Sequence, residues 1–167
     1  MPPRPEFEDL YREFLPRIYG YALAQLRNSA EAEDVTAQVF INAYRAYDRF
    51  EPTAATPAAW LFRIARNAIL DCHRRSGVRD RVEQEVGRGL GAGPDPSEVA
   101  EDRILFAELL VAVRRLPARQ RGVVGLRHRS DLSFLVICEL LGCSEGAAQM
   151  LDPRALKVLR AELRPDG

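Results

Sequence analysis

The 167-residue chain is poor in metal ligands and has no long apolar run. Its three cysteines are odd in number and form no CxxC pair, and the two isolated histidines, His73 and His128, add too few ligands for zinc. No apolar run approaches the roughly 18 residues that span a membrane, and the opening Met-Pro-Pro-Arg-Pro-Glu contains no apolar signal-peptide core. We therefore expect a cytoplasmic protein without a metal, another cofactor or a membrane partner.

Catalytic motifs are equally scarce. The sequence offers no paired carboxylates, no nucleophile–base pair and no Gly-rich phosphate loop, because the glycines between Gly87 and Gly93 precede no capped helix of the P-loop type. The sequence therefore disfavours an all-helical enzyme.

The chain has no overall excess of charge, since 24 Lys and Arg residues balance 24 Asp and Glu residues. The positive charge is nevertheless concentrated: residues 60–81 contain six arginines against two aspartates, whereas residues 82–100 are mildly acidic. A basic patch inside a neutral protein is an electrostatic footprint for nucleic acid. We expect moderate DNA affinity from this chain alone, so tight binding would need a larger partner.

Residues 56–75 are the stretch around which the rest is organised. Apolar residues recur there at helical spacing and predict one buried face: Trp60, Leu61, Ile64, Ala65, Ala68, Ile69 and Cys72. We expect Thr56 to be the N-cap and Pro57 the first helical residue. The other face is basic, with exposed aromatics at its N-terminal end, and suits a DNA backbone and an unstacked base. The alternative is a solvated basic face with Trp60 and Phe62 in the core.

The remaining pattern is helical throughout. We expect helices over residues 6–27, with a flaw at Pro16, and from a cap at Ser29 to about Asp48. Residues 82–97 are rich in Gly and Pro and predict a flexible linker. Further helices are expected from Ser97 to Leu116, from Pro117 and after Asp131-Leu132-Ser133. The turn Gly142-Cys143-Ser144, with Ser144 capping a last helix, completes a helix-turn-helix pattern.

Two blocks in this order resemble the group IV, or extracytoplasmic-function (ECF), sigma factors of bacterial RNA polymerase, within the sigma-70 family. The first block is 32-AEDV-35 with Phe40, followed by 60-WLFRIARN-67 and Arg74-Arg75. The second is 116-LPARQR-121 with 140-LLGCSEG-146. The resemblance covers about residues 7–164. It implies an all-α protein of two small helical domains: sigma region 2 over 6–77, a flexible linker over 78–97 and sigma region 4 over 98–164.

The resemblance also implies a function and its residues. A non-enzymatic subunit would bind the β′ and β subunits of core RNA polymerase and melt promoter DNA at the −10 element, where the loop 49–56 would capture a flipped base. Contact with the polymerase would come from Asp34, Val35, Gln38 and Phe40. Contact with −10 DNA would come from Trp60, Phe62, Arg63, Arg66, Asn67, Arg74 and Arg75. Contact with −35 DNA would come from Ser144, Glu145, Arg154 and Lys157.

The sequence departs from the family pattern in the last helix. Three positions where the family usually carries cations hold Gln149, Leu151 and Pro153, and Asp152 adds repulsion toward phosphate. We expect Pro153 to break or kink the helix. Leu135, Val136, Met150 and Leu151 predict an exposed hydrophobic patch. Two interpretations stay open, weakened −35 reading or docking of an anti-sigma factor or transcriptional coregulator, and we favour the first. A stand-alone helix-turn-helix regulator is the alternative function.

Overall fold

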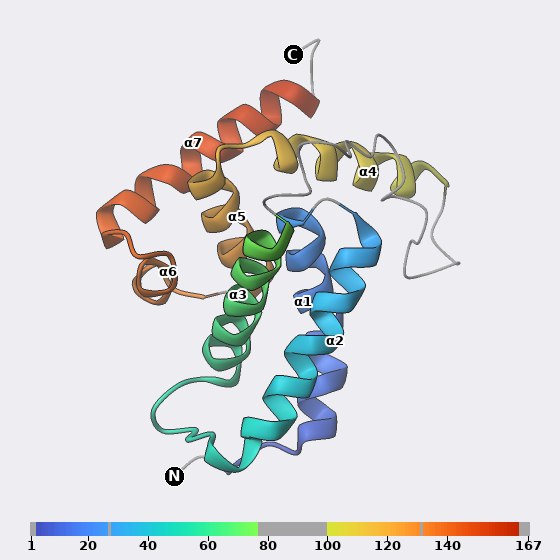
Figure 1. The fold of residues 1–167 in the computed structure, drawn as a ribbon. Coiled ribbons are helices and arrows are strands. Elements are labelled where there is room, and N and C mark those ends of the chain that lie inside the picture. Colours follow the sequence, from blue (N-terminus) through green and yellow to red (C-terminus); the bar gives the residue numbers. More distant parts are fainter. Residues whose placement is uncertain (1–2, 27, 77–99, 131, 164–167) are drawn as a thin grey trace.

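The computed structural model of the chain describes residues 3–26, 28–76, 100–130 and 132–163, and all its regular elements in these ranges are helices (Figure 1). The elements are α1 (Phe7–Gln25), α2 (Ser29–Ala46), a 3-10 turn (Tyr47–Arg49), α3 (Pro57–Ser76), α4 (Ala100–Arg115), α5 (Ala118–Ser130), α6 (Phe134–Leu141) and α7 (Glu145–Leu163). The predicted all-α class is confirmed. The predicted linker and the predicted start at Ser97 lie outside the described residues.

Helices α1, α2 and α3 form an N-terminal bundle, and local capping chemistry sets where they begin. The Thr56 hydroxyl accepts a hydrogen bond from the Ala59 N–H at 3.1 Å, and Pro57 is the first residue of α3, as predicted. The predicted cap at Ser29 is wrong: the Asn28 side chain accepts from the Glu31 N–H at 2.8 Å, so α2 begins one residue earlier. Pro16 lies inside α1 on an exposed side.

Helices α4 to α7 form a C-terminal bundle that ends in the predicted helix-turn-helix. Ser133 caps α6 and Ser144 caps α7, each hydroxyl accepting a backbone N–H three residues ahead. Gly142 ends α6 at φ 67°, the left-handed conformation that glycine adopts without strain. The two helices are bent by 99° from each other, as in helix-turn-helix motifs.

The expected break at Pro153 is wrong. Helix α7 continues through Pro153 to Leu163, and its buried stripe is Ala148, Asp152, Ala155 and Leu159. Pro153 lies on the exposed side, where water can satisfy the carbonyl that its missing N–H leaves unpaired. Asp152 is turned inward, and its carboxylate lies 2.9 Å from Nε2 of His128 in α5. The expectation that Asp152 faces outward and repels DNA phosphates is therefore wrong as well.

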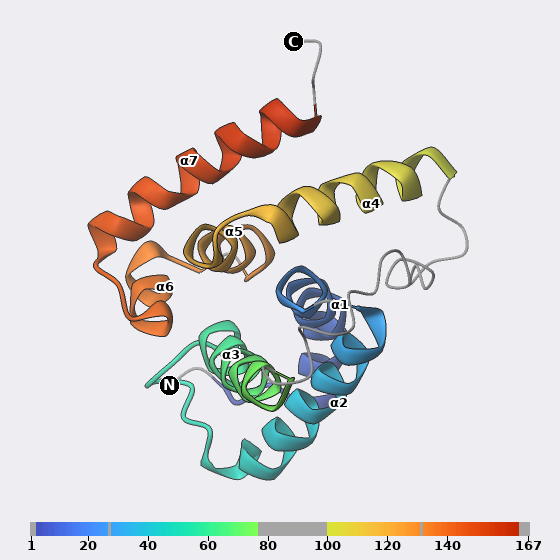
Figure 2. The same ribbon diagram turned by 45° about the horizontal axis from the view of Figure 1, so that its top comes forward.

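Helix α1 joins the two bundles, because it contacts α2 and α3 on one side and α4 and α5 on the other. Figure 2 views α1 nearly along its axis and shows these pairs on its opposite sides. The buried hydrophobic residues of both bundles accordingly form one continuous cluster. Among the described helices, no single one is long and apolar enough to cross a membrane; the bent α6–α7 pair meets that test only by length and composition.

Candidate nucleic-acid and polymerase interface

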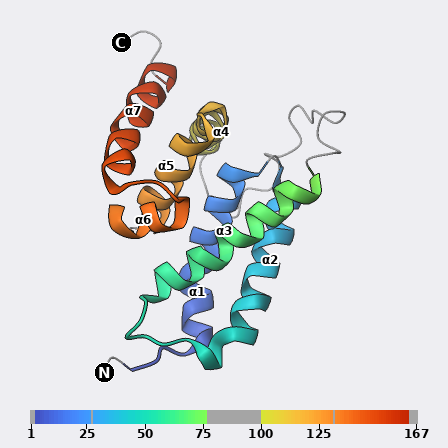
Figure 3. The same ribbon diagram turned by 60° about the vertical axis from the view of Figure 1, so that its left-hand side comes forward.

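The front of α3 presents the predicted basic face. Arg63, Asn67, Arg74 and Arg75 are exposed along it, and in Figure 3 the helix runs between α2 on one side and α6 on the other. The only acid of this helix, Asp71, lies 3.5 Å from a guanidinium nitrogen of Arg74 at an exposed site. Such a pair contributes little in water, so the Arg74 charge stays available to a phosphate.

Stacked aromatic rings close the N-terminal end of α3. The Trp60 ring lies 4.5 Å, between centroids, from the ring of Phe50, with an interplanar angle of 25°. Phe50 is buried, Trp60 is half-buried, and the loop 51–56 runs between them in the chain. Arg4 supports this corner by donating to the carbonyl oxygens of Asp48 and Phe50. Phe50 lies in the loop 49–56 that was expected to capture a base, whereas Arg4 belongs to no periodic pattern and carried no sequence signal.

Phe62 does not lie beside Trp60 on the surface. Its side chain is 0% exposed and makes an edge contact with Tyr21 of α1, with ring centroids 5.5 Å apart. The expectation of an exposed aromatic at Phe62 is therefore wrong, because this residue falls on the buried face of α3. Its function is to anchor α3 on α1.

Arg66 is turned away from the basic front, toward the C-terminal bundle. Its guanidinium lies beside the hydroxyl of Tyr21, which is fully buried. Burial raises the pKa of the Tyr21 hydroxyl, and the positive charges of Arg66 and Arg121 oppose that shift. A cavity of about 220 Å³ lies at this point between the bundles. Its lining comprises Tyr21, Gln25, Arg66, Ile69, Leu70 and His73 from the N-terminal bundle, and Ala118, Arg119, Arg121, Leu141, Cys143 and Leu151 from the C-terminal bundle.

Three of the four residues predicted to contact polymerase line one groove, and the fourth lines another. Asp34, Val35 and Gln38 line a groove of about 770 Å³ between α2 and α3, together with Asn67, Asp71 and other residues, and Asp34 and Gln38 are exposed there. Phe40 lines a second groove, between α1 and α2. Val35 and Phe40 are buried, each 5% exposed. The structure thus leaves Asp34 and Gln38 accessible, while Val35 and Phe40 hold α2 in place.

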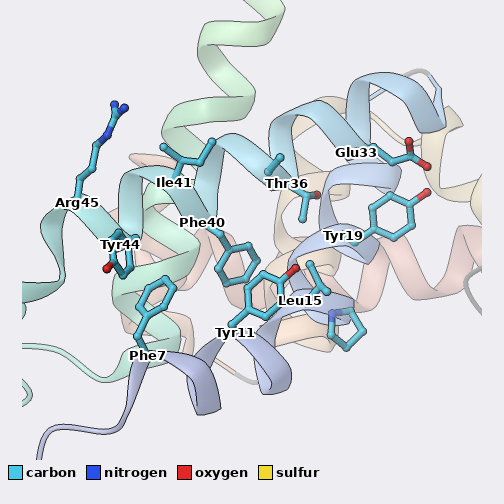
Figure 4. Close-up of a pocket in the computed structure, with 12 residues that line it drawn as sticks. Phe7, Tyr11, Leu15, Tyr19, Glu33, Thr36, Phe40, Ile41, Tyr44 and Arg45 are labelled. Atoms are coloured by element: carbon cyan, nitrogen blue, oxygen red, sulfur yellow. The ribbon is translucent and has the colours of Figure 1, made fainter.

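A second, apolar groove of about 880 Å³ runs between α1 and α2 (Figure 4). Aromatic rings gather at its centre, where Tyr11 meets the edge of Phe40 and Phe7 meets Tyr44. Ile41 and Tyr44 are exposed there, and Glu33 and Arg45 are part of the lining. An apolar groove of this size on the exposed side of α2 is typical of an interaction surface.

The candidate −35 residues lie on α7 and its cap. The Ser144 hydroxyl is engaged with the Ala147 N–H, whereas Glu145, Arg154 and Lys157 are exposed. The residues of the predicted hydrophobic patch do not all lie on one exposed surface. Leu135 and Met150 are each 55% exposed, while Leu151 lines the cavity beside α3.

Within the described residues, no three His, Cys, Asp or Glu side chains lie together as metal ligands would. The three cysteines are free thiols.

Known proteins resemble this chain over most of its length. Residues 10–79 match the Sigma-70 region 2 family. The chain is 34% identical to the ECF RNA polymerase sigma factor BldN of Streptomyces coelicolor over 163 residues, which cover 96% of this chain but 61% of BldN. It is also 34% identical to the RNA polymerase sigma factor CarQ of Myxococcus xanthus, with 92% of this chain and 87% of CarQ covered.

The fold has solved counterparts. The sigma factor RpoE, in complex with the anti-sigma factor NepR from Bartonella quintana, superposes with a TM-score of 0.77 at 23% identity, covering 96% of this chain and 98% of that one. CnrH, in complex with the cytosolic domain of CnrY, has a TM-score of 0.68 at 24% identity, covering 96% and 89%. These structures show the fold. The chain is also 31% identical to the ECF RNA polymerase sigma factor SigL of Mycobacterium tuberculosis, with 95% of this chain and 89% of SigL covered, and it therefore belongs to the ECF RNA polymerase sigma factors.

Proposed function

We propose that the chain is a non-enzymatic, cytoplasmic transcription initiation factor that binds core RNA polymerase and opens promoter DNA at the −10 element. The basic front of α3, next to the stacked Phe50 and Trp60, is the observation that carries this proposal. Membership of the ECF sigma factors favours it over the stand-alone helix-turn-helix regulator. The chain spans only 61% of the length of BldN.

Opening DNA requires a base to leave its stack, at a cost of a few kcal/mol that contact with an aromatic ring offsets. The indole of Trp60, with the loop 51–56 beside it, offers such a surface. Arg63, Arg74 and Arg75 are positioned to bind phosphates, and the Asn67 amide can contact a base edge or the backbone. Arg66, partly buried beside the Tyr21 hydroxyl, is the remaining arginine of this set.

Binding to polymerase is assigned to the exposed side of α2. Asp34 and Gln38 supply accessible polar groups there, and the neighbouring apolar groove adds Ile41 and Tyr44. A polar rim next to an apolar centre is the usual composition of a protein interface. We place the contact with the β′ subunit on this surface and a contact with β on the C-terminal bundle.

The C-terminal bundle is proposed to contact the −35 element weakly. Arg154 and Lys157 provide two exposed cations one helical turn apart, and the Ser144 cap presents the positive end of α7. Leu135 and Met150 remain exposed beside them. An anti-sigma factor or transcriptional coregulator is the second candidate partner of this region. The complex of RpoE with the anti-sigma factor NepR favours the anti-sigma factor.

Run-off transcription with purified core polymerase tests the proposal. The Arg63→Ala/Arg74→Ala variant should retain core binding and lose open complexes, detected as unpaired thymines by permanganate footprinting. Arg12→Ala is the matched control, since this exposed arginine of α1 pairs with Glu8 outside the site. A wild-type chain that neither bound core nor initiated would refute the proposal.

A chain ending after Gly93 tests the C-terminal bundle in the same assay. Continued initiation by this truncated chain would show that −35 contact is dispensable and would favour the protein-docking interpretation. Loss of initiation with retained core binding would support −35 contact.

A further inference from the structure

A cationic cavity lies between the two bundles. Its volume is about 220 Å³, and it lies where α3 contacts α5 and α6 (Figure 2). Three arginines line it, Arg66 from α3 and Arg119 and Arg121 from α5, and His73 of α3 is part of the same lining. Among the described residues of this lining, none is Asp or Glu. The cavity therefore gathers positive charge from both bundles around one small space.

The three arginines have no acidic partner of their own. Elsewhere in the molecule an arginine pairs with a nearby carboxylate, as Arg12 does with Glu8. Within the described part of the chain, no carboxylate lies within ion-pair distance of Arg66, Arg119 or Arg121. Like charges that are held together without a counter-ion repel one another, and they do so more strongly where water is excluded.

Two of these arginines are partly buried against neutral groups. Arg121 donates from Nε to the Gln25 side chain at 3.3 Å and from Nη1 to the Arg114 carbonyl oxygen at 3.4 Å. Burial lowers the pKa of the Arg121 guanidinium, because no negative charge compensates for the water that it loses. Arg66 lies beside the fully buried hydroxyl of Tyr21. An anion in the cavity would supply the counter-charge that these neutral partners do not.

The lining also provides the hydrogen-bond donors that oxyanions need. A guanidinium carries five N–H donors in a fork that matches phosphate oxygens. Ala118 and Arg119 form the first turn of α5, where unpaired backbone N–H groups add partial positive charge. A single phosphate group carries a charge of about −1.5 to −2 near neutral pH, so two linked groups match three guanidinium charges better than one does. The volume of about 220 Å³ is several times the share of about 30 Å³ that one water takes in the liquid, so two such groups fit.

We propose that this cavity is a binding site for a diphosphate group, held between Arg66 of the N-terminal bundle and Arg119 and Arg121 of the C-terminal bundle. Two kinds of ligand carry this group, free pyrophosphate and a nucleoside diphosphate. His73 and Arg119 are exposed, so the cavity is open to solvent, and the nucleoside of the second ligand can remain outside it. The site goes beyond the proposed function, because its ligand is a small anion and not polymerase or promoter DNA.

Isothermal titration calorimetry with sodium pyrophosphate tests the site in the full-length chain, without polymerase, DNA or divalent cations. We expect saturable binding by the wild-type chain. Arg66→Gln and Arg119→Gln each remove one positive charge, from opposite bundles, and each should weaken pyrophosphate binding by about fivefold or more at fixed ionic strength. Arg12→Gln is the matched control and should leave the affinity unchanged, because this exposed arginine of α1 lies outside the cavity.

Thermal unfolding provides a second measurement. A ligand that binds only the folded state raises the melting temperature. Pyrophosphate should therefore stabilise the wild-type chain and Arg12→Gln, but not the Arg66→Gln/Arg119→Gln double variant. If Arg66→Gln does not fold, Arg119→Gln decides the test, since its side chain is exposed and the substitution leaves the buried contacts of Tyr21 intact.

ADP in the same titration distinguishes the two kinds of ligand. Tighter binding of ADP than of pyrophosphate would assign the site to a nucleoside diphosphate, whereas equal or weaker binding of ADP would assign it to the free anion. Sulfate that bound as tightly as pyrophosphate at the same ionic strength would overturn the diphosphate assignment.

The proposal is overturned if neither pyrophosphate nor ADP binds saturably, or if neither Arg66→Gln nor Arg119→Gln weakens the binding. These measurements use no polymerase and no promoter. Failure of the wild-type chain to initiate transcription would therefore refute the proposed function alone, and failure of anion binding would refute this site alone.

Discussion

Replacing Asp152 distinguishes an acid that packs inward from one that repels DNA. The Asp152 side chain is 12% exposed and lies 2.9 Å from His128, whose side chain is 47% exposed. A hydrogen bond to a charged group contributes about 1.5–3 kcal/mol. Because water can reach half-exposed His128, we expect Asp152→Ala to cost about 1.5 kcal/mol, at the lower end of this range. For a chain of this size, the melting temperature should fall by about 3–6 °C.

Thermal unfolding followed by circular dichroism gives the stability, and a salt titration of DNA binding gives the electrostatic contribution. Asp152→Ala should leave the slope of log K against log salt unchanged, because the inward carboxylate faces no phosphate. Glu139→Ala, which removes an exposed acid of α6, is the control for net charge. Unchanged stability together with tighter DNA binding by Asp152→Ala beyond that of the control would refute the inward placement.

Three further changes test single features. Thr56→Ala removes the N-cap of α3 and should cost about 1 kcal/mol in urea unfolding, whereas Thr53→Ala, in the exposed loop, should have no effect. Gly142→Ala forces a side chain into the left-handed conformation and should lower the unfolding free energy by about 1–2 kcal/mol, while Gly146→Ala, with open space around its Cβ, should cause no loss. Burial raises the pKa of Tyr21 above its ordinary 10.0, so the stability from its neutral hydroxyl is complete below that value and is lost as pH rises through the raised pKa. Urea unfolding on both sides of that value should show this loss, and Tyr21→Phe should reduce it; an equal loss in the variant would contradict the assignment.

Local patterns predicted most of the helical framework. The N-caps at Thr56, Ser133 and Ser144 each depend on a hydrogen bond to a residue three positions ahead. The local sequence therefore suffices to predict where these helices begin. Asn28 and Ser29 are both good cap residues, and the sequence gives no reason to prefer the one that the structure uses. The helix-turn-helix was likewise predictable, because the Gly142 turn separates two segments whose apolar residues recur at helical spacing.

Long-range contacts caused the errors. Proline inside a helix costs free energy through local contacts alone. In α7 the burial of the apolar stripe and the contact between Asp152 and His128 outweigh this cost, so the helix continues through Pro153. The spacing of Ala148, Asp152 and Ala155 could have indicated that Asp152 faces inward. No local signal could have shown that Arg66 turns toward the C-terminal bundle, because its neighbours there are remote in sequence.

The stacked pair of Phe50 and Trp60 has a spectroscopic consequence. Trp60 is the only tryptophan of the chain, so the intrinsic indole emission arises entirely from the corner of α3 where an unpaired base is proposed to bind. A base that stacked on this ring would quench its emission without any attached dye. The wild-type protein is therefore its own optical probe of strand separation.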